Sequence, residues 1–186
     1  MTSDTIISVF LGIGLAASVG FRVFLPLFAL SLVSYFDIWE LNENFQWIGG
    51  SLALLTLGVA TIVEVLAYYM PYVDNVLDTI AVPLAAVAGT AVMVLVIIDL
   101  NPLITWALAI IAGGGTAATV SGSSSATRLT STASTAGFAN PVISTLETVA
   151  ALIMTIVSLL LPVLGFICVL VIMYIIFKVF KKIRPR

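Results

Sequence analysis

Apolar runs follow one another along almost the entire chain, and this pattern restricts the fold more than any other feature. In a helix, about 20 consecutive apolar residues cross roughly 30 Å of hydrocarbon. Only 9% of the residues are charged and 61% are hydrophobic, so there is too little polar surface to cover a water-soluble globule. We therefore expect an all-α integral membrane protein with a single transmembrane domain over residues 1–186.

The first apolar segment, at about residues 5–36, is too long for one perpendicular span. Arg22 and Pro26 lie near its middle, in "GFRVFLP". We expect this segment to be tilted, kinked or folded as two half-helices, with a broken or re-entrant part near 20–26.

The remaining apolar runs bring the expected number of transmembrane helices to about six. Their expected spans are residues 47–70, 77–98 and 102–120, followed by two crossings within 142–177 that turn at Pro162 and Gly165. Small residues at Ala81, Ala85 and Gly89 predict close packing of the third span. Aromatic residues near the span ends are expected to be interfacial anchors: Trp39, Trp47, Tyr68, Tyr69 and Tyr72.

Five of the seven basic residues lie in the last nine positions, 178–186. An excess of Lys and Arg marks the cytoplasmic side of a membrane protein, so this tail is expected to be cytoplasmic, at the inner membrane of a cell. Six crossings place the N-terminus on the same side. The first residues lack a basic region and a small-residue cleavage site, which favours a retained span over a signal peptide.

The two halves of the chain share a weak internal pattern. "GLAASVG" before Arg22 matches "GTAATVS" before Arg128, and a later [ST]-x-x-E motif ends at Glu64 or Glu147. Three crossings per half predict two inverted-topology repeats, at about residues 5–99 and 102–182. The abundance of Ala and Gly in the chain is the alternative source of the match.

Ionisable side chains at bilayer depth each cost at least about 2.5 to 3.5 kcal/mol, so those that are retained need partners or water and mark functional sites. The candidates for binding an ion or solute are Arg22, Glu64, Asp74, Asp78, Arg128 and Glu147, together with Ser144. The two arginines could present guanidinium donors to a carboxylate or phosphate-like group. Alternatively, Arg22 reaches a headgroup or pairs with Glu64, and Arg128 is a topology signal.

Helical spacing indicates which face the two glutamates occupy. Glu64 shares a stripe with Thr61 and Tyr68, which places it on an inward face. Around Glu147, residues three or four apart form a continuous stripe of polar and small side chains: Ser144, Glu147, Ala151, Thr155 and Ser158. The alternative for Ser144 and Glu147 is a capping box after Asn140 and Pro141.

The run "SGSSSATRLTSTAST", residues 121–135, is far more polar than its surroundings. Non-helical backbone at membrane depth survives only where it is buried in protein or lines water. We therefore expect a broken or re-entrant segment over 113–136 that forms a cavity wall. The expected lining residues are Gly115, Ser121, Ser124, Thr61 and Thr155. The alternative is an ordinary cytoplasmic loop over 121–140.

Cofactor and metal chemistry are not expected, because the chain has no histidine and its one cysteine, Cys168, lies in an apolar run. Catalysis is not expected either, since the only bases are carboxylates and the lysines of the tail. We expect no nucleic-acid partner. Membrane lipids and a small ion or solute are the expected partners, and a homo-oligomer is left open.

Three motifs together resemble an uncharacterised bacterial multi-pass inner-membrane family that is described only as a domain of unknown function. They are "GLAASVGFRVFLP", "EVLAYYMPYVDNVLD" and "ATRLTSTASTAGFANPVISTLE". The resemblance implies no activity. It implies these motif positions: Arg22, Glu64, Pro71, Asp74, Asp78, Arg128, Asn140, Pro141 and Glu147.

The leading functional hypothesis is a small transporter or channel for a small ion or solute, anionic and proton-coupled, with its site near the midplane between the halves. In a second version the carboxylates bind a cation and the arginines are structural. A third hypothesis is a non-transporting lipid-binding or membrane-assembly subunit that uses the basic tail.

Overall fold

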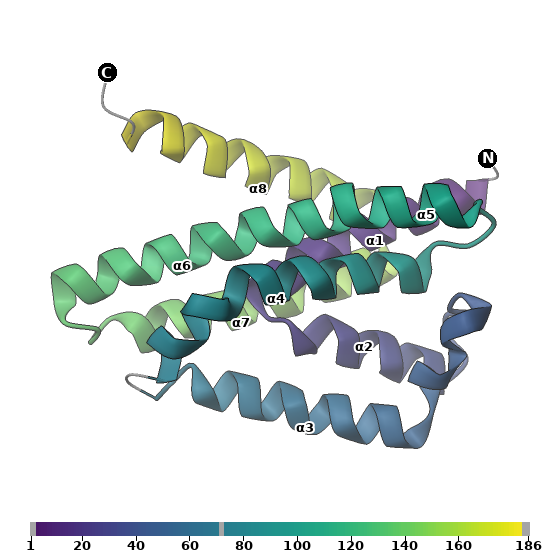
Figure 1. The fold of residues 1–186 in the computed structure, drawn as a ribbon, viewed down its shortest axis with the longest axis horizontal. Helices are drawn as coiled ribbons and strands as arrows, with labels where there is room; N and C mark the ends of the chain where they lie inside the picture. Colours follow the sequence, from purple (N-terminus) through teal and green to yellow (C-terminus); the bar gives the residue numbers. More distant parts are fainter. Residues whose placement is uncertain (1–2, 71–72, 184–186) are drawn as a thin grey trace.

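The computed structural model describes residues 3–70 and 73–183, and over these residues the fold is entirely helical (Figure 1). Here η1 is a 3₁₀ helix and η2 is a π-helical turn. The elements in chain order are α1 (Ser3–Phe21), α2 (Phe24–Tyr35), η1 (Glu43–Gly49), α3 (Ser51–Ala67), α4 (Val73–Val96), α5 (Pro102–Leu108), η2 (Ala109–Gly114), α6 (Gly115–Thr135), α7 (Asn140–Leu160) and α8 (Pro162–Ile183).

Five helical stretches of the described chain are long and apolar enough to cross a membrane: α1, α4, the run from α5 through α6, α7 and α8. The pair η1 and α3 adds a sixth if it counts as one span, although it bends by 66°. The bend lies at Gly50, whose backbone is extended. The turn between the last two spans is confirmed, because α7 ends at Leu160 and α8 begins at Pro162. The fold class is therefore that of a multi-pass membrane protein.

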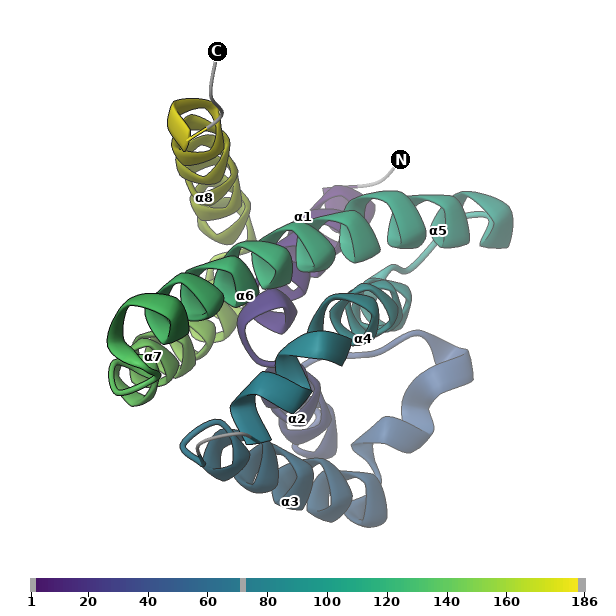
Figure 2. The ribbon, with the colours of Figure 1, turned by 60° about the vertical axis from the view of Figure 1, so that its left-hand side comes forward.

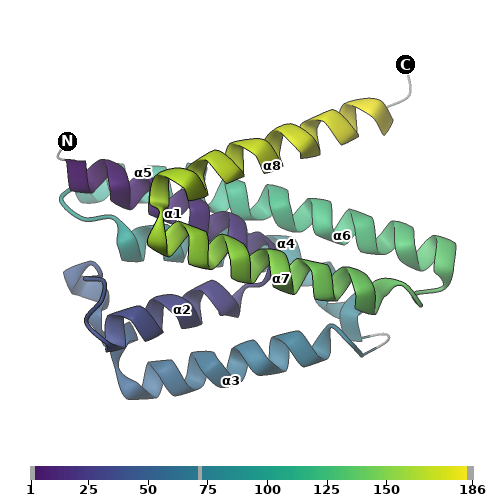
Figure 3. The same cartoon turned by 180° about the vertical axis from the view of Figure 1, so that it is seen from behind.

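The break in the first apolar segment is confirmed, and it separates two helices. α1 ends at Phe21 and α2 begins at Phe24. The first N–H groups of a helix have no partner within it. Here Glu64 accepts hydrogen bonds from the N–H groups of Val23 (2.7 Å) and Phe24 (3.0 Å). Figures 1 and 3 show that α2 then runs back toward the end of the molecule where α1 begins.

The expectation of a broken or re-entrant segment over 113–136 is wrong, and so is the alternative of a loop. The chain is helical without interruption from Pro102 to Thr135. Serine and threonine hydroxyls within a helix can donate to the carbonyl four residues earlier, so a helix can accommodate a run of them. Thr119, Thr127, Thr130, Ser134 and Thr135 all do so, at 2.8 to 2.9 Å.

The glycine run that precedes the polar stretch serves helix packing. A Cβ added to Gly113 would lie 2.6 Å from the carbonyl oxygen of Gly89 on α4, and one added to Gly89 would lie 2.5 Å from the Cβ of Ala117. Small residues let two helix backbones approach this closely. The predicted close packing of Ala81, Ala85 and Gly89 agrees with their burial in the structure.

α1 is the central helix of the bundle, since it packs against α4, α6, α7 and α8. Leu11, Leu15 and Val19 form part of its buried core. α8 is held only along part of its length, and Figure 2 shows it leaning away from α6 and α7.

The arrangement of the helices differs from the expected inverted repeat. An inverted repeat requires the two matched small-residue helices, α1 and α6, to run in opposite directions. Figures 1 and 3 show them running in the same direction. The beginning of α1 and the end of α8 also lie at opposite ends of the long axis, whereas an even number of crossings would bring both to one face. The side of the membrane on which each terminus lies stays a prediction.

Candidate functional site

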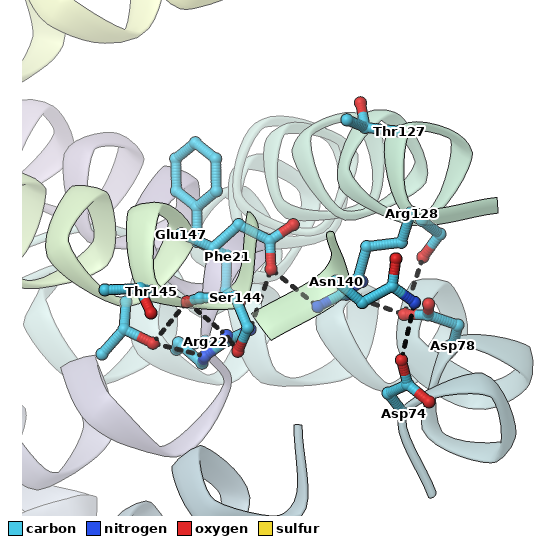
Figure 4. A network of polar contacts seen from close by, with 12 residues as sticks. Phe21, Arg22, Asp74, Asp78, Thr127, Arg128, Asn140, Ser144, Thr145 and Glu147 are labelled. Carbon is cyan, nitrogen blue, oxygen red and sulfur yellow. Dashed lines mark hydrogen bonds and ion pairs between the residues drawn. The ribbon is translucent and has the colours of Figure 1, made fainter. Parts of the chain in front are cut away.

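A buried ionic network joins the end of α1 to α4, α6 and α7 (Figure 4). Its central group is the carboxylate of Glu147 on α7. Oε2 of Glu147 accepts from Nη1 of Arg22 at 3.2 Å and from Nη1 of Arg128 at 2.6 Å. The structure thus brings together Arg22 from the first third of the chain with Arg128 and Glu147 from the last third.

Arg22 is fully buried, and all three of its guanidinium nitrogens have partners. Besides Glu147, it donates to the hydroxyl of Thr148 at 3.0 Å and to the carbonyl of Phe21 at 2.9 Å. Its Nη2 donates to the carbonyl (2.9 Å) and the hydroxyl (2.7 Å) of Ser144. Arg22 therefore links the end of α1 to the first turns of α7 through hydrogen bonds. Because its side chain is fully buried, it does not reach a lipid headgroup.

Arg128 on α6 divides its guanidinium between two carboxylates. Its Nη2 lies 2.7 Å from Oδ1 of Asp78 on α4, and its Nη1 contacts Glu147. Its Nε is buried and has no hydrogen-bond partner. Arg128 is only 3% exposed, so it is part of the network and not a topology signal at the membrane surface.

Two further carboxylates lie beside the network, where N–H groups satisfy them. Glu64 accepts from the first backbone N–H groups of α2, where the dipole of a helix favours negative charge. Asp74, which is 4% exposed, accepts from Nδ2 of Asn140 at 2.8 Å and from the N–H of Asn75 at 2.8 Å. The same Nδ2 of Asn140 donates to Thr132 at 2.9 Å.

These contacts divide the charges into two sets. Glu64 and Asp74 are held by dipoles, while Asp78 and Glu147 are the two carboxylates that form ion pairs with Arg22 and Arg128. Two positive and two negative charges balance in that inner set. Buried charges are retained when they are paired. Each charge of the inner set has a partner of opposite sign, although Nε of Arg128 and Oε1 of Glu147 have no hydrogen-bond partner among the described residues.

Tyr68 belongs to the site, although its place near a span end predicts an interfacial anchor. It is 8% exposed, and the guanidinium carbons of Arg22 and Arg128 each lie 4.3 Å from the centroid of its ring. Guanidinium groups within about 6 Å of an aromatic face are attracted to it. The stripe shared with Glu64 was the sequence signal for this position, and the interface assignment of Tyr68 is wrong.

Of the remaining candidates, Ser144 contacts the network, whereas Thr155 and Thr61 have other hydrogen-bond partners. Ser144 belongs to it through Arg22, and because α7 begins at Asn140 with no side-chain cap, the capping-box interpretation is wrong. Thr155 is buried against Ser18 of α1, with their hydroxyl oxygens 2.7 Å apart. Thr61 bonds only the Leu57 carbonyl of its own helix.

The predicted cavity residues on α6 separate into two groups. Ser121 and Ser124 are buried on its inner face. Gly115 is exposed, and a Cβ built on it would meet no atom within 4 Å, so it faces away from the site. Of the motif positions and tail residues, Pro71, Tyr72, Arg184 and Arg186 lie outside the described residues.

A pocket of about 310 Å³ adjoins the network between α6, α7 and α8. Glu147 lines it, together with Ser123, Ser124 and Thr127 of α6. Oε1 of Glu147 is buried and has no hydrogen-bond partner within residues 3–70 and 73–183. The described residues contain no group of three or more His, Cys, Asp or Glu side chains placed to hold a metal ion.

Comparison with protein families finds a match over most of the chain. The model described as Domain of unknown function (DUF4126) matches residues 9–182, which is nearly the whole chain. Neither the curated proteins nor the solved structures compared with the chain contain a match.

Proposed function

We propose that this chain, which belongs to the DUF4126 family, is a small membrane transporter that moves a small anion together with a proton. The observation that carries the proposal is the position of one carboxylate oxygen. Oε2 of Glu147 accepts from both arginines, so an internal carboxylate occupies the place where two guanidinium groups would hold an anionic solute.

Protonation of Glu147 is the coupling step. Arg22, Arg128, Asp78 and Glu147 are neutral together when all four are ionised. When Glu147 takes a proton, the inner set carries one positive charge, and the guanidinium groups lose their shared partner. A solute anion then restores the balance, so proton and anion binding favour each other, and by linkage each raises the affinity for the other.

A cation-binding site built from the four carboxylates has less support than the proposed anion-binding site. Glu64 and Asp74 face N–H donors, and Asp78 and Glu147 face arginines, so these carboxylates do not converge on a common point. Divalent and monovalent cations need several oxygen ligands around one position. The same geometry supports the anion version.

The test is anion-driven proton movement in liposomes that contain the purified protein and a trapped pH indicator. We expect an inward gradient of methanesulfonate to acidify the lumen. Arg128→Gln should abolish the acidification, because one of the two donors to the anion is lost. Glu147→Gln should let the anion enter without a proton. The neutral glutamine forms no ion pair with Arg22 and Arg128, and it cannot take up a proton.

The matched control is Glu43→Gln, which removes a carboxylate that is exposed in η1 and far from the network along the chain. It should transport like the wild type. Size-exclusion elution identifies variants that fail to fold. If the wild type moves no proton with methanesulfonate, the transport proposal is wrong, and the lipid-binding or assembly role remains.

A further inference from the structure

The pocket beside Glu147 has walls of two kinds. Its polar lining includes Glu147 of α7 with Ser123 and Ser124 of α6. The facing wall on α8 is aliphatic and includes Ile172 and Ile176. The volume, about 310 Å³, is at the lower end of the range of roughly 300 to 1,000 Å³ for small-molecule sites. Such a pocket fits a small molecule with one polar end and an apolar body.

The α8 wall of the pocket is partly exposed. Figures 2 and 3 show that α8 diverges from α7 after their shared turn. Ile175 of α8 lines the pocket and is 53% exposed. An apolar chain that lies against α8 can therefore extend out of the pocket while its polar end stays beside the network.

Building on the transport function proposed above, we infer that the substrate is an amphiphilic monoanion, a single carboxylate-like oxyanion on a short apolar chain. Its head takes the place of Glu147 Oε2 at Arg22 and Arg128, and its chain lies against the isoleucines of α8. A single charge is required because protonation of Glu147 frees only one positive charge. A dianion would leave one negative charge unbalanced at a buried site.

The unpartnered oxygen of Glu147 identifies the group that changes state. Among the described residues Oε1 has no hydrogen-bond donor, whereas Oε2 receives two. The proposal therefore assigns the proton to Oε1, the oxygen that neither arginine contacts. The polar hydroxyls of Ser123 and Ser124 line the same pocket and give the released carboxyl group polar surroundings.

The test uses n-alkylsulfonates, which stay anionic over the working pH range and therefore do not cross the bilayer as neutral acids. The readout is the concentration that gives half-maximal proton uptake in the liposome assay. We expect the apparent affinity to rise about fourfold for each added methylene, the gain for burying one CH₂ group. The rise should stop when the chain fills the pocket.

Ala150→Phe reduces the pocket volume, because Ala150 lines it. This variant should lose the gain for longer chains and keep the wild-type affinity for methanesulfonate. Val149→Phe is the matched control, because Val149 is the neighbouring residue, is 47% exposed and does not line the pocket. Ile175→Ala enlarges the pocket from the α8 side, so it should move the optimum to longer chains even if Ala150→Phe does not fold.

Two results would overturn the inference in distinguishable ways. Equal affinity for every chain length, with proton-coupled methanesulfonate uptake intact, would contradict the amphiphilic substrate. The proposed transport function would not be affected by that result. No proton-coupled uptake of any sulfonate, methanesulfonate included, would contradict both the amphiphilic substrate and the transport function.

Discussion

Replacement of Arg22 tests the contacts that hold the site together. Arg22→Met removes the partners of Ser144, Thr148 and the Phe21 carbonyl, but these groups are neutral, and the Thr148 hydroxyl keeps its 2.9 Å bond to the Ser144 carbonyl. Glu147 keeps Arg128 but loses one of its two cationic donors. Removal of one partner of a buried ion pair costs about 3 to 5 kcal/mol, and we expect a decrease of this size in the free energy of unfolding.

The assay is equilibrium unfolding of the purified protein in mixed micelles, followed by the loss of helical circular dichroism. Arg22→Lys should recover only part of the loss, because one ammonium group cannot reproduce the planar fork of donors. Lys178→Met, in the exposed end of α8, is the control and should stay within about 0.5 kcal/mol of the wild type. Arg22→Met with wild-type stability would refute the assignment of Arg22 as the link between α1 and α7.

Three further predictions use the same unfolding measurement. Tyr68→Phe should leave the free energy of unfolding unchanged. Tyr68→Leu should lower it by about 1 to 3 kcal/mol, because two cation–π contacts are lost. Equal effects of the two variants would contradict this. Gly113→Ala should cost about 1 to 3 kcal/mol, since its Cβ meets the backbone of α4, and Gly115→Ala should cost nothing, since its Cβ meets no atom. Ser158→Ala should be neutral or stabilising because the Ser158 hydroxyl is buried without a partner, and a loss above about 1 kcal/mol would indicate a hidden bond.

The positions of the site residues could be predicted because charge is expensive at bilayer depth. Arg22, Arg128 and Glu147 were all identified on that ground, and they meet in the structure. The helical stripe on α7 was equally informative. Each of its members, from Ser144 to Ser158, is buried.

The pairing of these residues was not predictable, because it depends on the relative placement of helices that are far apart in sequence. Glu64 is an example: it could have paired with Arg22, but it accepts from the backbone that follows Arg22. For the polar run 121–135 the prediction from composition is wrong for a different reason. Many hydroxyls suggest irregular backbone, yet Thr127 and Thr130 bond carbonyls of their own helix, and Arg128 is buried on the inner face of that helix.

The most direct test of the account is the number of protons taken up when an anion binds. Purified protein in weakly buffered detergent solution is titrated with methanesulfonate while a pH electrode records the proton change. If Glu147 leaves the two arginines by protonation, one proton is taken up for each anion bound, and Glu147→Gln binds the anion with no proton uptake. Anion binding without proton uptake in the wild type, or unchanged uptake in Glu147→Gln, would contradict the account.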